Sequence, residues 1–154
     1  IVRPEQMRDE MCAALGGRAA EKVIFDKIST GALSDLEKVT KQARAMVTVY
    51  GLSDKIGNLT YYDSSGENEY GFSKPYSEKT AELIDKEISS IIETQYDRAI
   101  KLLEENKEKL TELAEVLLKK EVIFKDNLEA IFGKRPFVVE AAVKHIPKKE
   151  EEEE

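Results

Sequence analysis

Apolar residues recur three and four positions apart through most of the chain, which is the spacing of helices with one buried face. Pro4 suits the first turn of a helix, where its missing N–H has no partner to lose. We expect that helix to be interrupted at Gly16-Gly17 and a second, short one to run from Arg18 to about Phe25. The two glycines beside two alanines suggest either close backbone packing or flexibility.

A loop and a third helix are predicted next. Lys27 to Ser34 is rich in the small, polar residues of turns, and apolar residues resume with helical spacing from about Leu33 to Tyr50. Gly51 stands where a glycine commonly ends a helix. Leu52 to Tyr76 has no helical periodicity, so we expect a long irregular segment, in which Ile56–Tyr62 is the candidate for a short strand.

The second half of the chain predicts three more helices. Ser77 is a suitable N-cap for a helix that runs to about Glu105, and Asn106 can cap a leucine-rich helix that follows. Together these two are predicted to form an αα-hairpin. A last short helix is expected over Asp126–Phe132. The long helix is expected to bury Ile84, Ile88, Ile91, Ile92, Gln95, Ala99 and Leu103.

The pattern as a whole predicts an all-α fold: a helical bundle with a long αα-hairpin, an irregular loop over about 52–76 and an acidic tail. We expect one helical domain over residues 1–133 and a charged, flexible tail over 134–154. The chain has 154 residues, of which 36% are charged, and a net charge of −7. It lacks the basic surface typical of nucleic-acid binders. No apolar run approaches the roughly 18 residues of a membrane span, so we expect a soluble chain without membrane contact of its own.

Few residues are candidates for chemistry. Cys12 is the only cysteine, which excludes an intrachain disulfide, and we expect it to be buried and inert. The single histidine, His145, lies in the tail, so a Ser-His-Asp triad or a metal site with two histidines is excluded from the folded body. Paired acidic residues such as Asp85 and Glu87 are expected on solvated helix faces. The chain alone does not resemble a complete enzyme.

Asp35 is the one carboxylate whose position is typical of a ligand-binding residue, since it follows a small-residue loop and falls in the first turn of a predicted helix. From spacing alone the ordinary interpretation is a carboxylate favoured by the helix dipole. A metal or substrate ligand presented from a helix start is the alternative.

Three stretches together carry a family resemblance: Met-Cys-Ala-Ala-Leu-Gly-Gly-Arg-Ala-Ala-Glu at 11–21, Ser-Thr-Gly-Ala-Leu-Ser-Asp-Leu at 29–36 and Ala-Met-Val-Thr-Val-Tyr-Gly-Leu-Ser at 45–53. In this order and spacing they resemble the peptidase domain of the FtsH family of membrane-anchored, ATP-dependent AAA+ zinc metalloproteases. The likeness continues through Ile84–Ile88 and Tyr96–Ala99 and fades after Gly133.

The resemblance implies a mostly helical peptidase domain in a homo-hexameric ring, into which polypeptide substrates are threaded by an ATPase module. It places that domain in the cytoplasm or an organelle matrix, beyond a membrane anchor. It also implies a zinc site built from a His-Glu-x-x-His helix and an acidic third ligand in the Ser-Thr-Gly-Ala motif. The matching position here is Asp35. ATP would belong to the parent's ATPase module.

The chain departs from this pattern in one respect, because no His-Glu-x-x-His and no Walker motif occurs in the 154 residues. The family places both upstream of where Ile1 begins. We therefore expect a fragment of an ATP-dependent zinc endopeptidase that degrades unfolded or membrane proteins, inactive alone and weak in zinc binding. The alternative is a non-catalytic helical interaction or assembly module derived from that family. Loss of the covering zinc helix is expected to make the isolated piece self-associate.

Overall fold

The computed structural model describes residues 1–62 and 74–136, and within these ranges the chain forms six α-helices, one 3-10 helix and no strand. The all-α prediction is confirmed. The chain divides into two compact units, Ile1–Lys107 and Glu108–Glu154. None of the described helices is both long and apolar enough to cross a bilayer.

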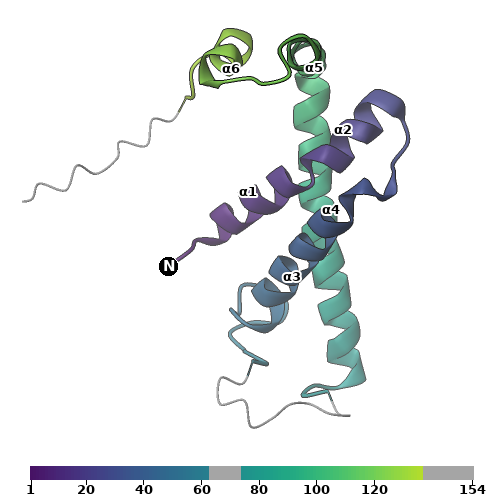
Figure 1. The fold of residues 1–154 in the computed structure, drawn as a ribbon. Helices are drawn as coiled ribbons and strands as arrows, with labels where there is room; N and C mark the ends of the chain where they lie inside the picture. The colour runs from purple at the N-terminus through teal and green to yellow at the C-terminus, as the bar shows by residue number, and fades with distance from the viewer. Residues whose placement is uncertain (63–73, 137–154) are drawn as a thin grey trace, which may run out of the picture. The chain divides into compact units, whose positions relative to one another are not determined.

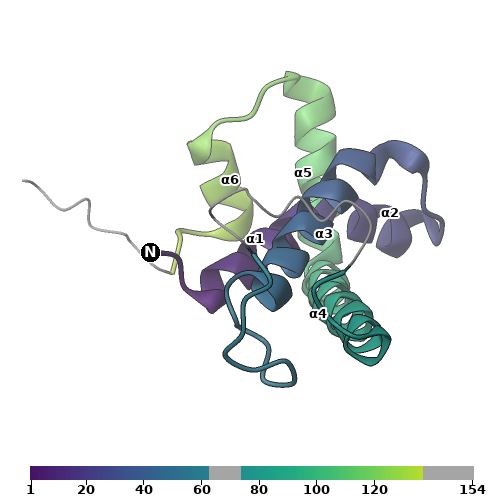
Figure 2. The same cartoon turned by 90° about the horizontal axis from the view of Figure 1, so that it is seen from below.

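The first unit is built around one long helix. Helix α4 (Glu78–Glu105) packs against α1 (Pro4–Ala14), α2 (Gly16–Phe25) and α3 (Leu33–Thr48), as Figures 1 and 2 show from two directions. α1 and α3 also pack against each other. The main hydrophobic cluster that these contacts bury consists of Met7, Met11, Leu15, Val39, Ala43, Met46, Val47, Ile84 and Ile88.

The junction between α1 and α2 lies one residue earlier than predicted. α1 begins at Pro4, as expected, but the break falls at Leu15, and both glycines lie in the first turn of α2. The backbone hydrogen bonds continue across the break, from Leu15 N to Met11 O at 3.0 Å and from Ala19 N to Leu15 O at 3.0 Å. Leu15 is only 1% exposed, so burial of its side chain fixes the bend.

The close packing suggested by the glycine pair is absent from the described structure. A Cβ added at Gly16 or Gly17 would meet no atom within 4 Å. The close approach occurs instead at Ala19, which is fully buried beside Cys12 and Ala99. The faces of the two glycines are therefore open.

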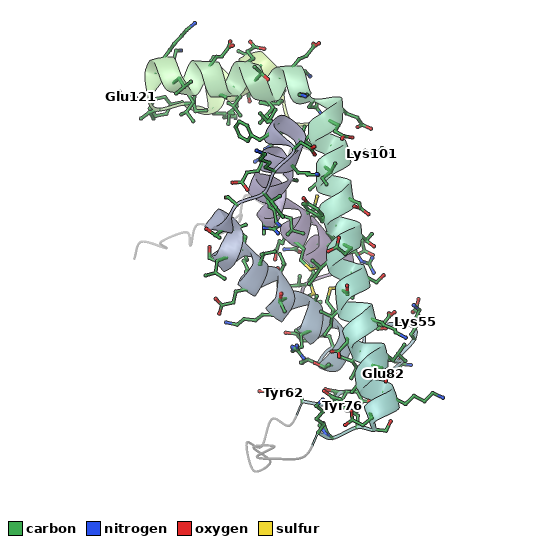
Figure 3. The ribbon with its side chains drawn as sticks, turned by 90° about the vertical axis from the view of Figure 1, so that its right-hand side faces the viewer. Lys55, Tyr62, Tyr76, Glu82, Lys101 and Glu121 are labelled. Carbon is green, nitrogen blue, oxygen red and sulfur yellow. The ribbon has the colours of Figure 1, made fainter. Side chains whose placement is uncertain are left out.

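The segment that follows α3 is attached to α4 by a polar cluster. Ser53 Oγ donates a hydrogen bond to Glu87 Oε2 at 2.8 Å, and Lys55 Nζ lies 2.8 Å from Glu87 Oε1. Figure 3 labels Lys55 on the flank of α4. The side chain of Glu87 is 12% exposed, so the expectation of a solvated carboxylate was wrong at this position. It is buried because two partners from a distant segment compensate its charge.

The predicted strand over Ile56–Tyr62 does not form. Gly57 turns the chain with φ 86°, and the N–H of Tyr61 donates to the Thr48 carbonyl at 2.7 Å, at the end of α3 rather than to a neighbouring strand. The Tyr61 ring meets the Tyr76 ring edge to face with centroids 5.0 Å apart. Both residues lie in the long segment that was predicted to be irregular, and its residues 63–73 fall outside the described ranges.

α4 has the predicted ends. The Ser77 hydroxyl accepts a hydrogen bond from Thr80 N at 3.2 Å, as an N-cap should. At the other end, the Asn106 side-chain amide donates to the Leu102 carbonyl at 2.8 Å and so caps a free carbonyl of α4. The helix buries Ala81, Ile84, Ile88, Gln95 and Ala99, in agreement with most of the predicted stripe.

The second unit contains α5 (Lys107–Lys120) and α6 (Lys125–Phe132), and neither has a fully buried residue. α6 ends at Gly133, whose φ is 80°. Because α4 and α5 fall in different units, their pairing as an αα-hairpin stays a prediction, and so does the domain boundary at 133. Most of the predicted charged tail, including His145, lies outside the described residues.

Candidate functional site

Asp35 is the third residue of α3, in the first helical turn. Its side chain is half-buried, and it makes no hydrogen bond or ion pair with any described residue. The free N–H groups of a first turn favour a negative charge, which stabilises the ionised carboxylate there. Among the described residues, Asp35 is therefore a carboxylate whose two oxygens have no partner.

A short 3-10 helix leads into this turn. It spans Thr30–Ala32, labelled η1, and α3 follows at Leu33 without a break. The Ser29 hydroxyl caps η1 by accepting a hydrogen bond from Gly31 N at 3.3 Å. The small residues predicted to form a loop here are thus partly helical, and they set the direction in which α3 starts.

Two side chains of α2 hold the start of this connection. Glu21 Oε2 accepts from Ser29 N at 3.0 Å, and Glu21 Oε1 accepts from the Ser29 hydroxyl at 2.7 Å. Arg18, one turn earlier on the same face, donates to the Ser29 carbonyl at 3.4 Å. Hydrogen bonding from the Ser29 side chain, supported by its backbone N–H and the charge of Arg18, lowers the pKa of Glu21. Glu21 is therefore an ionised acceptor whose two oxygens fix one residue.

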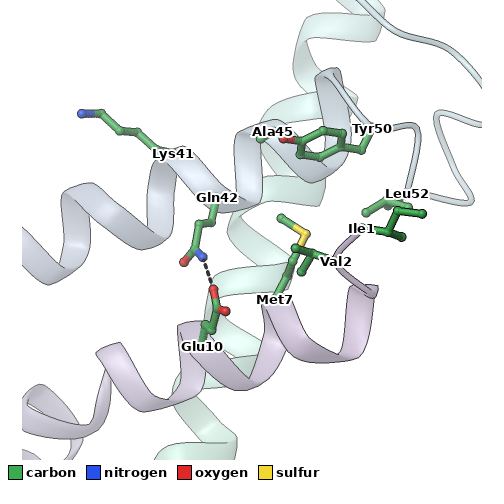
Figure 4. A pocket seen from close by; sticks show the side chains of 9 residues that line it. All are labelled: Ile1, Val2, Met7, Glu10, Lys41, Gln42, Ala45, Tyr50 and Leu52. Carbon is green, nitrogen blue, oxygen red and sulfur yellow. Dashed lines mark hydrogen bonds between the residues drawn. The ribbon is translucent and has the colours of Figure 1, made fainter. Parts of the chain in front are cut away.

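A pocket of about 710 Å³ opens between α1 and α3 (Figure 4). Its lining is mostly apolar and consists of Ile1, Val2, Met7, Glu10, Lys41, Gln42, Ala45, Tyr50 and Leu52. Gln42 Nε2 donates to Glu10 Oε2 at 3.0 Å across it, whereas Gln42 Oε1 is shielded from solvent and has no partner among the described residues. A shielded, unpartnered amide oxygen is uncommon in a finished fold.

Asp35 does not line this pocket, but it shares a helix face with Gln42, which does. Gln42 follows it by seven residues, which is about two helical turns and returns the side chain to nearly the same face. Asp35 therefore stands at the N-terminal end of the helix face that lines the pocket.

The described residues do not make a complete metal site. No three His, Cys, Asp or Glu side chains among them lie close enough to hold one ion. Cys12 is not a substitute ligand, because it is buried and desolvation raises the pKa of its thiol, as the sequence led us to expect. Asp85 is exposed on α4, and Glu87 is occupied by Ser53 and Lys55. Asp35 fits zinc as one ligand, not as a full set.

The sequence alone did not single out the contacts of Glu21 with Ser29. Glu21 stood only in a stretch quoted for its family resemblance, and its partner lies eight residues away across a helix end. An Arg and a Glu three apart on one helix face are a weak signal, since such pairs are common on solvated surfaces.

Known proteins resemble this chain over most of its length. The pattern of peptidase family M41 matches residues 1–131. The ATP-dependent zinc metalloprotease FtsH of Parabacteroides distasonis is 59% identical over 138 residues, which cover 90% of this chain and 20% of that protein. The ATP-dependent zinc metalloprotease FTSH 3, mitochondrial, of Arabidopsis thaliana is 50% identical over 137 residues, covering 89% of this chain and 17% of that protein.

The chain thus spans about a fifth of the length of the curated relatives that it matches. The FtsH resemblance carried by the three sequence stretches is confirmed, and the match extends well beyond them. It includes the turn with Asp35 and the helix that holds Glu21. The chain belongs to peptidase family M41.

Proposed function

We propose that this chain is the helical part of a zinc metallopeptidase domain and that Asp35 is the third protein ligand of the zinc. The other two ligands would be the histidines of a His-Glu-x-x-His helix outside these 154 residues. The observation that carries the proposal is the Asp35 carboxylate, which is half-buried in the first turn of α3 and has no partner among residues 1–62 and 74–136, in a chain of peptidase family M41.

The surroundings of Asp35 support an incoming helix. The pocket between α1 and α3 is mostly apolar, and its Gln42 has a shielded amide oxygen with no donor among the described residues. The faces of Gly16 and Gly17 are open, so another backbone can approach them closely. Both features are what a fold presents where a further element packs, and Asp35 lies about two turns before the pocket residue Gln42 on α3.

Zinc bound by Asp35 and two histidines would polarise the scissile carbonyl and make water a nucleophile at neutral pH. The contribution of this chain is narrower. Its carboxylate supplies one negative charge at a fixed place, and α3 holds that place through its buried residues Val39, Ala43 and Met46. We further propose, from the names of the relatives, that the whole protein is ATP-dependent and cleaves polypeptides.

Other properties of the whole protein belong to the same proposal. As an FtsH-type protease it would form a homo-hexameric ring, carry a membrane anchor, and expose this domain to the cytoplasm or an organelle matrix. ATP would bind to its ATPase module and not to this chain. The present chain alone would be inactive and would hold zinc only weakly, because one carboxylate falls short of three ligands.

The test is the variant Asp35→Asn in the whole protein that contains this chain. It keeps the shape of the side chain and removes the charge that zinc requires. We expect its zinc content after gel filtration, and its ATP-dependent hydrolysis of unfolded casein, to fall by more than the roughly 100-fold that loss of a ligand-orienting group costs.

The control is Asp85→Asn, the same change at an exposed position of α4. It should leave zinc content and casein hydrolysis unchanged. If Asp35→Asn retains its zinc and its proteolysis, Asp35 is a helix-start carboxylate and not a ligand. If the whole protein contains no zinc and cleaves nothing, the chain is a non-catalytic helical module.

A further inference from the structure

We infer that Glu21 is a positioning residue for the zinc ligand Asp35, acting through Ser29 and the 3-10 helix between them. This inference rests on the proposed function, because it assigns to Glu21 the task of aiming a carboxylate that binds metal. Glu21 itself does not touch the site. Its role is to fix the connection that sets where α3 begins.

Helix α2 holds Ser29 by hydrogen bonds from two of its side chains. The two carboxylate oxygens of Glu21 take the backbone N–H at 3.0 Å and the hydroxyl at 2.7 Å. Hydrogen bonds to an ionised acceptor are stronger than neutral ones, and a two-point contact fixes orientation as well as distance. Arg18 adds a longer contact at 3.4 Å to the carbonyl of the same residue. All three polar groups of Ser29 are therefore held from α2.

The second step leads from Ser29 to Asp35. Ser29 Oγ, while donating to Glu21, accepts from Gly31 N at 3.3 Å and thereby caps η1. η1 runs directly into α3, and its Ala32 is buried. Only Leu33 and Ser34 separate the end of η1 from Asp35. Because this connection is a hydrogen-bonded turn, a displacement of Ser29 should also displace the first turn of α3, which carries Asp35.

The third step is that nothing else described holds Asp35 in place. Its carboxylate has no hydrogen bond or ion pair with any described residue, so its position depends on the backbone of the first turn. A metal ligand needs its orientation fixed to within a fraction of an ångström, usually by a neighbour that hydrogen-bonds it. Here that task falls to the backbone anchor at Ser29, and the residue that makes the anchor is Glu21.

The neighbouring carboxylate Asp26 provides a matched comparison. It lies in the same connection, five residues after Glu21, and it too is ionised and hydrogen-bonded, to Lys22 Nζ at 2.6 Å. It makes no hydrogen bond with Ser29. Asp26 has φ 52°, and asparagine tolerates that conformation, so Asp26→Asn removes the charge without straining the turn.

The test has two parts, and the first uses this chain without metal. Amide hydrogen exchange at positions 29 and 31 is followed by NMR in wild type, Glu21→Gln, Glu21→Ala, Ser29→Ala and Asp26→Asn. The Ser29→Ala variant keeps a backbone N–H at position 29, so its exchange can still be measured. We expect roughly 10-fold faster exchange in the three variants that break the anchor, since each loses hydrogen bonds that hold this connection. Exchange in Asp26→Asn should match that of wild type.

The second part uses the whole protein loaded with Co²⁺ or Zn²⁺. We expect Glu21→Ala and Ser29→Ala to bind zinc about 10- to 100-fold more weakly in chelator competition. We also expect a changed Co²⁺ ligand-field spectrum, which reports ligand geometry and which general destabilisation does not alter. Ser29→Thr, which keeps the hydroxyl, should restore the wild-type spectrum.

The outcomes separate this inference from the function on which it rests. Loss of zinc in Asp35→Asn together with wild-type affinity and spectrum in Glu21→Ala and Ser29→Ala overturns the positioning role and leaves the proposed function standing. Retention of zinc in Asp35→Asn overturns both. If Glu21→Ala does not fold, Ser29→Ala carries the same test, because it breaks the anchor from the other side.

Discussion

The hydroxyl of Ser53 donates to the carboxylate of Glu87 at 2.8 Å across 34 residues of sequence. Ser53 is 5% exposed, and the Glu87 side chain is 12% exposed. Lys55 neutralises the other oxygen from the solvent side. This polar contact adds to the apolar packing of Leu52 and Ile56 on the core and ties the segment after α3 to the N-terminal half of α4.

Replacing Glu87 by glutamine should therefore destabilise the chain. The amide oxygen can still accept from Ser53, but the amide NH₂ then faces the ammonium of Lys55, and a charge-assisted bond is lost. We expect the free energy of unfolding in urea to fall by about 1 kcal/mol. Glu82→Gln, on the exposed side of the same helix (Figure 3), should change it by less than about 0.5 kcal/mol.

The pH dependence of that difference follows from the pKa of Glu87. Hydrogen bonding from Lys55, and then from Ser53, holds it below its ordinary value despite burial. The stabilisation is therefore fully present above the unfolded pKa of about 4.3 and disappears as the pH falls through the lower folded value. Urea unfolding of wild type and Glu87→Gln should differ at pH 7 and converge in acid. A difference that stays constant down to acid pH would contradict this assignment.

The bend at Leu15 allows a matched test of core burial. Leu15 is 1% exposed between α1 and α2, whereas Leu102 on α4 is 46% exposed. Leu15→Ala should cost about 2–5 kcal/mol through lost contacts and a residual cavity. Leu102→Ala should cost less than about 1 kcal/mol, since little apolar surface is lost from the interior. Equal losses in thermal or urea unfolding would mean that Leu15 does not anchor the core.

Two glycines should respond to alanine in opposite directions. Gly17 lies in the first turn of α2 with open space where a Cβ would be, so Gly17→Ala should stabilise this chain by about 0.4–1 kcal/mol. Gly51 has φ 61°, and an added Cβ would lie 3.4 Å from the carbonyl oxygens of Gly57 and Leu59. Gly51→Ala should destabilise by about 1 kcal/mol or more. Thermal unfolding of both variants tests these two predictions. A lower stability of Gly17→Ala than of wild type would show that another group occupies the space beside Gly17.

The helices were largely predictable because their signals are local. Pro4, Ser77 and Gly133 mark helix ends by their own backbone and side-chain chemistry, and the structure uses each of them as predicted. Apolar spacing located the buried stripe of α4, since one face of a long helix must meet the core.

The errors arose where the outcome depends on a distant partner. Leu15, not the glycine pair, breaks the first helix, because a buried leucine decides the bend. Ile56–Tyr62 has the composition of a strand but no strand to pair with among the described residues. Glu87 was predicted to be solvated because its partners, Ser53 and Lys55, lie more than 30 residues earlier in the sequence and reach it only through the chain reversal after α3.

Asp35 was found by resemblance rather than by spacing. A single carboxylate at a helix start is common, and only the surrounding Ser-Thr-Gly-Ala stretch raised it above the ordinary interpretation. The anchor from Glu21 could not be foreseen, since it needs the angle between α2 and the loop that follows. Whether Asp35 binds zinc stays a prediction until its variants are measured.

Asp35 shares one helix with the centre of the core. Val39, Ala43, Met46 and Val47 follow it on α3, all at 1% exposure or less. Val39 lies one turn after Asp35, so stabilising the first turn of α3 also stabilises the helix that carries these core side chains. We expect an ion bound by Asp35 to slow amide exchange along α3, and so to stabilise the core together with the site.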